Sequence, residues 1–383
     1  MSEEKRKTAL MLRAGGLGDC VILTVIAREL NKRGYDVDYF VGSPTGKVHL
    51  LLEKLPFLRS VKPIARLNGI DCIEDEDENG VAVDIMKKDY DEVFDFKFSV
   101  EDNRAGLNSK EGWRSSINSN YTNWIDLSLA WANIDPTFVE DKCPVVELPD
   151  KKYSEWAQAA IGERGKRPHK VVGIQLQASS LTRTWYKAGE LPEVLHQKYP
   201  DDIVLIFADN AWFALTSYGK EKIEFPDEYD PLCCSTALIK EMDVFISADS
   251  GTSHIAEAVG THTIGIYTTV PSWTRVRDYK HAHPIDALVL CHPCFVLDVF
   301  CPLERKRAAE QLNERQQDII NGGDSGANVF DFAKKYNTVP KAIIEEYNAL
   351  KKQTEAMSAA EPACVKSITT ELILAKLGEI YGL

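Results

Sequence analysis

The sequence predicts an α/β protein made of two Rossmann-like domains that face each other across a cleft. A chain of 383 residues is too long for one compact core. A strand–turn–helix–strand pattern begins near Thr8, and the same alternation restarts near Lys170. Because Rossmann-like sheets bind ligands at the carboxyl ends of their strands, two such domains are expected to share a site.

The composition is that of an ordinary folded protein, with 44% hydrophobic and 27% charged residues. A formal net charge of −13 disfavours binding through non-specific contacts to nucleic acid or anionic lipid. Neither a signal peptide nor a bilayer-spanning apolar run is apparent, which predicts a cytoplasmic protein without a membrane span. Thiols stay reduced there, so the nine cysteines are expected to be core residues, metal ligands or catalytic groups.

The first domain is expected to span residues 1–150. Its elements are predicted from the spacing of apolar residues: strands at 8–13, 37–41 and 91–96, a helix that ends at Gly34, and a helix–strand pair at 47–64. The acidic run at 71–80 is interpreted as a solvated loop rather than a carboxylate metal site, because like charges repel each other.

An aromatic segment follows at residues 103–135. Its ring residues Trp113, Tyr121, Trp124 and Trp131 could line a binding surface. Trp124, Leu127 and Trp131 also have the spacing of one helix face, so the simpler interpretation is that these three pack in a core.

The second domain is expected to span residues 151–290, after a boundary at 148–170 that is rich in proline, glycine and charge. Its strands are predicted at 170–177, 202–209, 243–248 and 262–267, and its helices at 188–197, 235–242 and 252–259. Residues 291–383 form a third region with a cysteine cluster, a helical insertion and a C-terminal helix.

The clearest candidate site is the turn "ADSGTSHIAEA", in which Ala248 ends a strand and Gly251 allows a tight turn. The N–H groups of Thr252, Ser253 and His254 lie at the positive end of the following helix and could receive a phosphate. The hydroxyls of Ser250, Thr252 and Ser253 add donors, and His254 is a candidate proton or hydrogen-bond donor to a leaving phosphate. The alternative is that Ser250 or Thr252 only caps the helix.

Cations follow other strands of the same domain. Arg183 and Lys187 come after the strand at 170–177, and Arg275 and Arg277 come after the strand at 262–267. A diphosphate held only by backbone groups would be under-neutralised, and cations at neighbouring strand ends would correct this.

The turn "RAGGLGDC" of the first domain is not a dinucleotide fingerprint, because Val21 occupies the position of its last glycine and the second strand ends without an acid. No NAD or flavin cofactor is therefore expected. Gly15, Gly16 and Gly18 would let a ligand approach the backbone. Asp19 is either a partner of the helix dipole or a general base held over the cleft.

The "GGLGD" turn, the Arg183-x-Trp185 pair and "DSGTSH" together resemble the heptosyltransferases of glycosyltransferase family nine, over roughly Lys7 to Pro284. The resemblance implies a GT-B fold and inverting transfer of a sugar from a nucleotide diphosphate donor, with ADP-heptose favoured. It implies Asp19 as the base that deprotonates the acceptor hydroxyl, and the Asp249–His254 turn as the diphosphate cradle. The family usually has lysine at Arg183, and arginine holds a phosphate in a different geometry.

The cysteine cluster has metal-site spacing. Cys291 and Cys294 form a C-x2-C clip, Cys301 supplies a third thiolate, and Cys364 is the candidate fourth ligand. The autotransporter heptosyltransferases, which the chain resembles most, carry a similar four-cysteine finger that binds iron. Four thiolates complete a tetrahedral shell, so the metal, iron or zinc, would be structural.

Two alternatives stay open for the cluster, thiols without metal and His292 as a ligand, whereas Cys233 and Cys234 are expected to be core residues. Residues 302–363 have the pattern of a helical insertion, and a second copy of the chain is a candidate partner.

The acceptor could be a protein serine or threonine, a glycan or lipid core, or a modified nucleobase. An alternative function is transfer from another donor, such as a UDP-pentose, to a modified DNA base. A catalytically inactive GT-B-like scaffold is the alternative from another class. A nucleotide-sugar epimerase or oxidoreductase would need the fingerprint that Val21 breaks.

Overall fold

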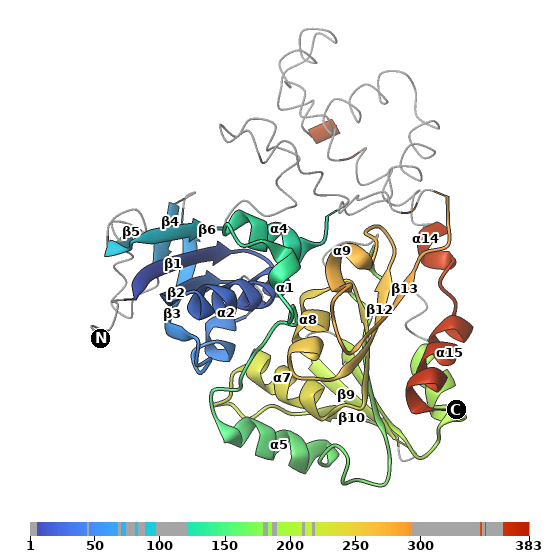
Figure 1. Cartoon of the computed structure of the whole chain (residues 1–383). Coiled ribbons are helices and arrows are strands. Elements are labelled where there is room, and N and C mark those ends of the chain that lie inside the picture. Colours follow the sequence, from blue (N-terminus) through green and yellow to red (C-terminus); the bar gives the residue numbers. More distant parts are fainter. Residues whose placement is uncertain are drawn as a thin grey trace.

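The chain forms two lobes, each with a mostly parallel sheet flanked by helices (Figure 1). The computed structural model describes residues 6–43, 46–67, 70–73, 81–82, 89–96, 122–178, 183–185, 190–208, 211–216, 219–290, 292, 345–346, 349 and 363–382. Trp113, Tyr121 and nearly all of the predicted insertion lie outside these residues. The two parallel sheets confirm the predicted α/β class, whereas the domain boundaries at 150 and 290 stay predictions.

The first lobe contains a sheet of order β5-β4-β3-β2-β1-β6. Its strands are β1 (Lys7–Ala14), β2 (Tyr35–Gly42), β3 (Leu58–Leu67), β4 (Ile70–Ile73), β5 (Val81–Ala82) and β6 (Glu92–Asp95). Its helices are α1 (Leu17–Ile22), α2 (Thr24–Lys32), α4 (Trp124–Trp131) and the 3-10 turns η1 (Val48–Leu51) and η6 (Pro136–Phe138). β1 pairs in parallel with both β2 and β6, which places its carboxyl end and the turn after it between these two strands.

The local structure of this lobe follows from its apolar pattern. Residues 9–12 of β1 are fully buried, because a central parallel strand is covered on both faces and so needs a continuous apolar run. The helix expected before Gly34 is divided at Leu23, where the Thr24 hydroxyl donates to Val21 O at 2.7 Å and accepts from Val145 N.

Two expectations for the first lobe were wrong. Asp71 and its neighbours belong to β4, which pairs antiparallel with β3, so the acidic run begins in a strand; residues 74–80 lie outside the described part. The helix expected at residue 47 is only the short η1 turn.

The second lobe contains a sheet of order β10-β9-β8-β7-β11-β12-β13. Its strands are β7 (Val171–Gln175), β8 (Ile203–Ala208), β9 (Ala211–Thr216), β10 (Gly219–Ile223), β11 (Val244–Ala248), β12 (His262–Tyr267) and β13 (Ala282–Asp286). Its helices are α5 (Lys151–Ile161), α6 (Leu191–Lys198), α7 (Pro231–Glu241), α8 (Gly251–Ala258), α9 (Trp273–Val276), α14 (Ala363–Lys366) and α15 (Thr370–Tyr381). The sequence pattern did not reveal β13, which carries Pro284 and lies at the edge of the sheet, where proline is tolerated.

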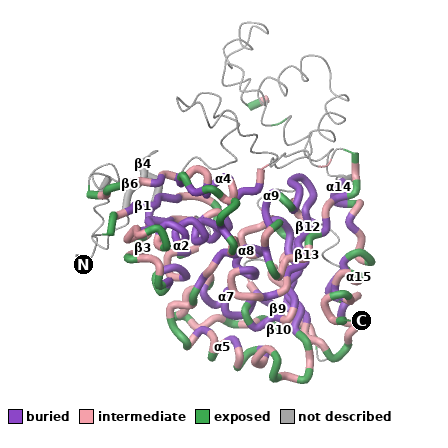
Figure 2. The backbone as a smooth tube through the Cα atoms, viewed as in Figure 1, coloured by how far each residue is buried: buried purple, intermediate pink, exposed green. Residues whose placement is uncertain are grey.

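Helices cover both faces of the second sheet. Phe245 of β11 packs toward α5, α7 and α8, whereas Val244 and Ile246 pack with α6 and α15 on the opposite face. Trp185 is fully buried on this opposite face, and its Nε1 donates to Ile368 O at 3.0 Å. The C-terminal helix is therefore part of the second lobe, and Figure 2 shows the buried stretches gathered in the central strands.

The two lobes share one hydrophobic core cluster, although each lobe also has a cluster of its own on the other face of its sheet. One hydrophobic cluster continues from α1 and α2 of the first lobe into α7 and α8 of the second, with Leu17 and Ile255 among its members. The helices α1 and α8 are in contact at this junction and lie side by side (Figure 1). The lobes are therefore packed together through this shared cluster.

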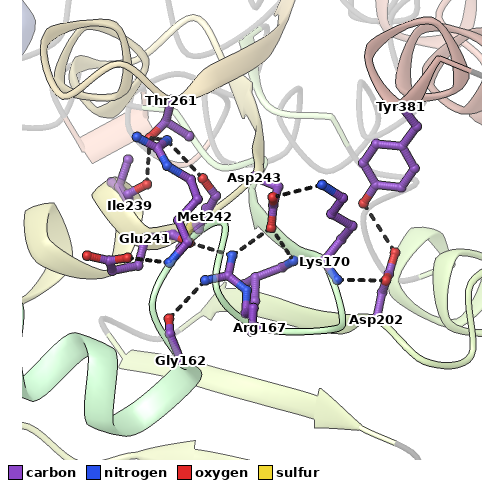
Figure 3. A network of polar contacts seen from close by, with 12 residues as sticks. Gly162, Arg167, Lys170, Asp202, Ile239, Glu241, Met242, Asp243, Thr261 and Tyr381 are labelled. Carbon is purple, nitrogen blue, oxygen red and sulfur yellow. Dashed lines mark hydrogen bonds and ion pairs between the residues drawn. The ribbon is translucent and has the colours of Figure 1, made fainter.

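The segment between α5 and β7, expected to be a domain boundary, is held to the second lobe by several hydrogen bonds. Arg167 donates to Asp243 at 2.6 Å and to Glu241 O, and Asp202 accepts from Lys170 N and from the Tyr381 hydroxyl (Figure 3). All these groups lie at the amino ends of β7, β8 and β11, away from the turn that precedes α8. The network therefore stabilises the lobe rather than forming a site. No helix in the described part of the chain is long and apolar enough to cross a bilayer.

Candidate active site

The amino ends of α1 and α8, one from each lobe, meet at the lobe junction. A Cβ on Gly18 would lie 2.6 Å from Cδ2 of His254 and 3.2 Å from Cα of Gly251. A Cβ on Gly251 would lie 2.8 Å from Gly18 N and from Cβ of Leu17. Two glycines are required here because the helix ends approach more closely than side chains allow. Gly18, expected to let a ligand approach, instead lets the second lobe approach.

The other two glycines of the turn make room for an ion pair. Arg13, at the end of β1, donates from Nη2 to Oδ2 of Asp19 in the first turn of α1, and from Nη1 to Phe96 O at 2.6 Å. A Cβ on Gly15 would lie 2.8 Å from Arg13 Nη2, and one on Gly16 would lie 3.2 Å from Asp19 Oδ2. The turn therefore holds Asp19 in place through Arg13.

The electrostatics of Asp19 suit a base that faces both lobes. Burial raises the pKa of Asp19, and the Arg13 guanidinium partly offsets this rise. Arg275 of the second lobe also lowers this pKa, and Asp249 raises it. Charged side chains of the second lobe therefore act on the carboxylate of Asp19 in the first lobe. The net result is a raised pKa, because the effect of burial exceeds the lowering by Arg13.

The turn before α8 contains a chain of hydroxyl groups. Ser250 Oγ lies 3.1 Å from Ser247 Oγ and 2.8 Å from Thr252 Oγ1, and Ser253 Oγ donates to Ser250 O at 2.7 Å. The Ser250 side chain makes no capping hydrogen bond to α8, which disfavours the simple-cap alternative. The expectation of three free N–H groups needs a correction: Ser253 N donates to Ser250 O at 3.2 Å.

His254 is buried and neutral. Its Nδ1 lies 2.7 Å from the hydroxyl of Tyr279, and burial lowers the pKa of His254 to about 4. At neutral pH the ring therefore carries no positive charge, so it can donate a hydrogen bond but does not act as an imidazolium acid. Tyr279 was not singled out in the sequence, because no motif marks it.

Arg183 and Asp249 lie together at the carboxyl end of β11. Nη1 of Arg183 is 3.2 Å from Asp249 O and 3.5 Å from its carboxylate, and both side chains are largely buried. Arg183 thus lies beside the turn before α8, as a diphosphate ligand would require. Lys187, its predicted companion, lies outside the described residues.

The two arginines of α9 and the turn after it have different surroundings. The Arg275 guanidinium is buried and lies 4.3 Å from the ring centre of Trp124, so a cation from the second lobe stacks on an aromatic side chain of the first. Arg277 instead pairs with Asp126 and Asp278, both at 2.7 Å. Arg277 therefore forms ion pairs at the lobe junction, and this placement does not support the expectation that it binds the diphosphate of the donor.

An open pocket lies beside Asp19. It is lined by Arg13, Asp19, Ile22, Leu23, Phe96, Trp124, Ser128 and Trp131. Helix α4 therefore combines the two interpretations of its aromatic residues, core packing and lining of a binding surface. Trp124 and Leu127 are buried in the core, and Trp124 and Trp131 also form a wall of the pocket.

Of the predicted metal ligands, only Cys364 falls among the described residues, and it is buried in α14. Cys291, Cys294 and Cys301 lie outside them. No group of metal-binding side chains occurs within the described part of the chain. His292, the alternative ligand, is already engaged: its Nδ1 lies 3.0 Å from Thr268 O and its Nε2 3.5 Å from Asp286. Cys233 and Cys234 are fully buried core residues, as expected.

Two solved structures with a similar fold are described as glycosyltransferases. The iron-containing dodecameric glycosyltransferase TibC from enterotoxigenic E. coli is 12% identical, with a TM-score of 0.53, 100% coverage of this chain and 78% of that one. A family 9 glycosyl transferase from Veillonella parvula is 11% identical, with a TM-score of 0.51 and coverage of 74% and 86%. The fold is therefore that of the GT-B glycosyltransferases. No curated protein sequence matches the chain.

Residues 232–289 match the model of glycosyltransferase family 9 (heptosyltransferase). This stretch runs from α7 to just after β13 and contains the Asp249–His254 turn and Arg275. Residues 232–289 of the second lobe are thus similar to the heptosyltransferases of family 9, as the motifs indicated.

Proposed function

We propose that this protein transfers a sugar from a nucleotide diphosphate donor to an acceptor hydroxyl, with inversion at the anomeric carbon. The observation that carries the proposal is the junction of α1 and α8, where Asp19 of one lobe comes within the electrostatic influence of Asp249 and Arg275 of the other. An inverting transfer needs one base and one diphosphate cradle on opposite sides of the sugar, and the two lobes supply one each.

In the proposed reaction, the Asp19 carboxylate takes the proton of the acceptor hydroxyl as its oxygen bonds to the anomeric carbon. The bond from that carbon to the diphosphate oxygen breaks, and the nucleoside diphosphate leaves with the electron pair. Arg183, Arg275 and the amino end of α8 would stabilise the charge that develops on the leaving group. His254 would donate a hydrogen bond to it from Nε2, while Tyr279 holds Nδ1.

The favoured donor is ADP-heptose. Its support is the match of residues 232–289 to a family described as heptosyltransferases, together with the turn inside that match. Arginine at position 183, where the family usually has lysine, is compatible with a diphosphate donor, because a guanidinium can bind two of its oxygens.

The test is incubation with a panel of ADP-, UDP- and GDP-sugars, with release of the free nucleoside diphosphate as the readout. We expect slow hydrolysis of one donor, faster turnover when an acceptor-containing extract is added, and loss of transfer by at least about a thousandfold in Asp19→Asn, since a carboxamide cannot accept the proton. Asp19→Asn should still bind the nucleotide within a few-fold. Failure of every nucleotide to bind would reject the proposal, and unchanged transfer by Asp19→Asn would reject the base.

We also propose a structural metal on Cys291, Cys294, Cys301 and Cys364. The described residues fit this in one respect: Leu288 N donates to Ser367 Oγ at 3.0 Å, and Ser367 Oγ donates to Cys364 O at 2.8 Å. The chain leading to Cys291 is thereby joined to the turn that carries the buried Cys364 thiol. TibC, whose fold this chain shares, is described as iron-containing, which favours iron over zinc. Bound metal would cross-link the two segments and take no part in the reaction.

Elemental analysis of protein purified without chelator should find about one metal per chain, and Cys364→Ser should lose it. Cys143→Ser is the matched control, because Cys143 is also buried but lies elsewhere, in contact with Asp278. Metal-free wild-type protein would reject the site. A cytoplasmic location and assembly into a homo-oligomer remain part of the proposal, the latter because TibC is described as dodecameric.

A further inference from the structure

The pocket beside Asp19 has a lining that restricts the chemistry of the acceptor. Most of its wall is aromatic or aliphatic, formed by Ile22, Leu23, Phe96, Trp124 and Trp131. The rings of Phe96 and Trp131 meet edge to face, with centroids 6.1 Å apart. Such a wall gains most from a flat apolar group, because aromatic pairs in offset or edge-to-face contact are stabilised beyond their buried area.

Among the described residues of the lining, few polar groups are free to bind a polyhydroxylated molecule. Arg13 is engaged with Asp19 and Phe96 O, and the Ser128 hydroxyl donates to Trp124 O at 2.9 Å. Two buried donors of the lining, Nε1 of Trp124 and Nε of Arg13, have no hydrogen-bond partner among the described residues. Each hydroxyl buried here without a partner would oppose binding. The lining therefore suits an acceptor with one reacting hydroxyl and at most two further acceptor atoms, for Trp124 and Arg13.

We infer that the acceptor hydroxyl is attached to a flat aromatic ring, directly or through one methylene group, and that the ring packs against Trp131 and Phe96 while the hydroxyl faces Asp19. The inference rests on the proposed function, since it makes Asp19 the group that takes the hydroxyl proton as the oxygen bonds to the sugar and the nucleoside diphosphate departs. It disfavours a glycan acceptor and an aliphatic serine hydroxyl.

The experiment uses the full chain with the donor found in the nucleotide-sugar panel. Two aromatic probes, benzyl alcohol and a 5-hydroxymethylpyrimidine nucleoside, are compared with a methyl glycoside and N-acetylserine amide. Binding is followed by ligand-observed NMR and transfer by mass spectrometry. We expect the aromatic probes to bind and to be glycosylated at least about tenfold faster than the other two. Preference for benzyl alcohol would indicate a small-molecule acceptor, and preference for the nucleoside a nucleobase.

Variants locate the binding. Trp131→Ala should weaken binding of the aromatic probes by about tenfold, while Trp131→Phe, which keeps a ring, should stay within about threefold. Phe138→Ala is the control, because Phe138 is 78% exposed and lies outside the pocket lining. Thermal melting of each variant separates lost binding from lost folding.

Two results would overturn the inference: preferential glycosylation of the methyl glycoside or the serine amide, or aromatic binding that Trp131→Ala leaves unchanged. Either result leaves the proposed function intact as long as the donor is bound and hydrolysed. If no nucleotide binds, the proposed function fails, and ring binding in the pocket is still measured by NMR.

Discussion

Gly18 of the first lobe lies against the imidazole of His254 of the second, with space for a hydrogen but none for a methyl group. A Cβ at Gly18 would come within 2.6 Å of His254 Cδ2. This contact limits how closely the predicted base and the predicted diphosphate cradle can approach, so the proposed reaction depends on it.

Gly18→Ala should therefore separate the two helix ends. We expect a loss of about 1–3 kcal/mol in the free energy of unfolding and a loss of transfer of at least tenfold. Gly378→Ala is the matched control, because Gly378 lies within α15 and a Cβ there meets no atom within 4 Å. That variant should gain about 0.5–1 kcal/mol from helix propensity. Denaturant unfolding and turnover measure both; equal stability of the two variants would contradict the proposed contact.

Arg13→Gln should change the pH dependence of the reaction. Burial already raises the pKa of Asp19, and removing the Arg13 charge should raise it further. A general base must be deprotonated, so the acid limb of kcat/KM should move to higher pH and activity at neutral pH should fall. Arg59→Gln, which removes a half-exposed ion pair with Asp38 in the same lobe, should leave the limb in place. A limb unmoved by Arg13→Gln would argue against Asp19 as the base.

Arg183→Ala should weaken donor binding, because it removes a cation beside the turn before α8. We expect the donor KM to rise by about tenfold, and Arg183→Lys to recover part of this loss, since charge is kept while the fork geometry is lost. Arg277→Ala provides the comparison: Arg277 pairs with Asp126 and should change the donor KM by less than threefold. Similar effects of both alanine variants would remove Arg183 from the donor site.

Tyr279→Phe should affect turnover more than binding. It removes the hydroxyl that lies 2.7 Å from His254 Nδ1, so the ring loses the partner that fixes its tautomer and orientation. We expect kcat to fall by about tenfold with the donor KM within threefold, and stability to fall by about 1 kcal/mol. Steady-state kinetics separate the two parameters. An unchanged kcat would indicate that the contact between Tyr279 and His254 is only structural.

His254 should make stability fall in acid. Its pKa is about 4 in the folded protein and near 6.5 when exposed, so the unfolded chain binds the proton more readily between these values. The contribution to stability is complete above about pH 6.5 and is lost as pH falls toward 4, amounting to about 3 kcal/mol. Denaturant unfolding at pH 7.5 and pH 4.5 should show a smaller difference for His254→Gln than for wild type. Equal differences would indicate that the imidazole is solvated.

The sequence by itself determined the α/β class, the central strands and the turns after them. Short continuous runs of buried residues, such as residues 9–12 and 244–248, are typical of central strands of a parallel sheet. The glycine-containing turns that follow these strands mark where ligands can approach. The sequence also identified Asp19 and the Asp249–His254 turn as candidate site residues, because both follow such strands.

Only the tertiary structure decided how these parts relate. Arg13 as the partner of Asp19, Tyr279 as the partner of His254, and Trp124 beneath Arg275 all join side chains that are distant along the chain or marked by no motif. Arg13 alone left a signal, a charge at the end of an apolar strand. The spacing of residues encodes local periodicity, whereas burial and charge pairing across a lobe junction depend on which surfaces meet, and that is settled by packing.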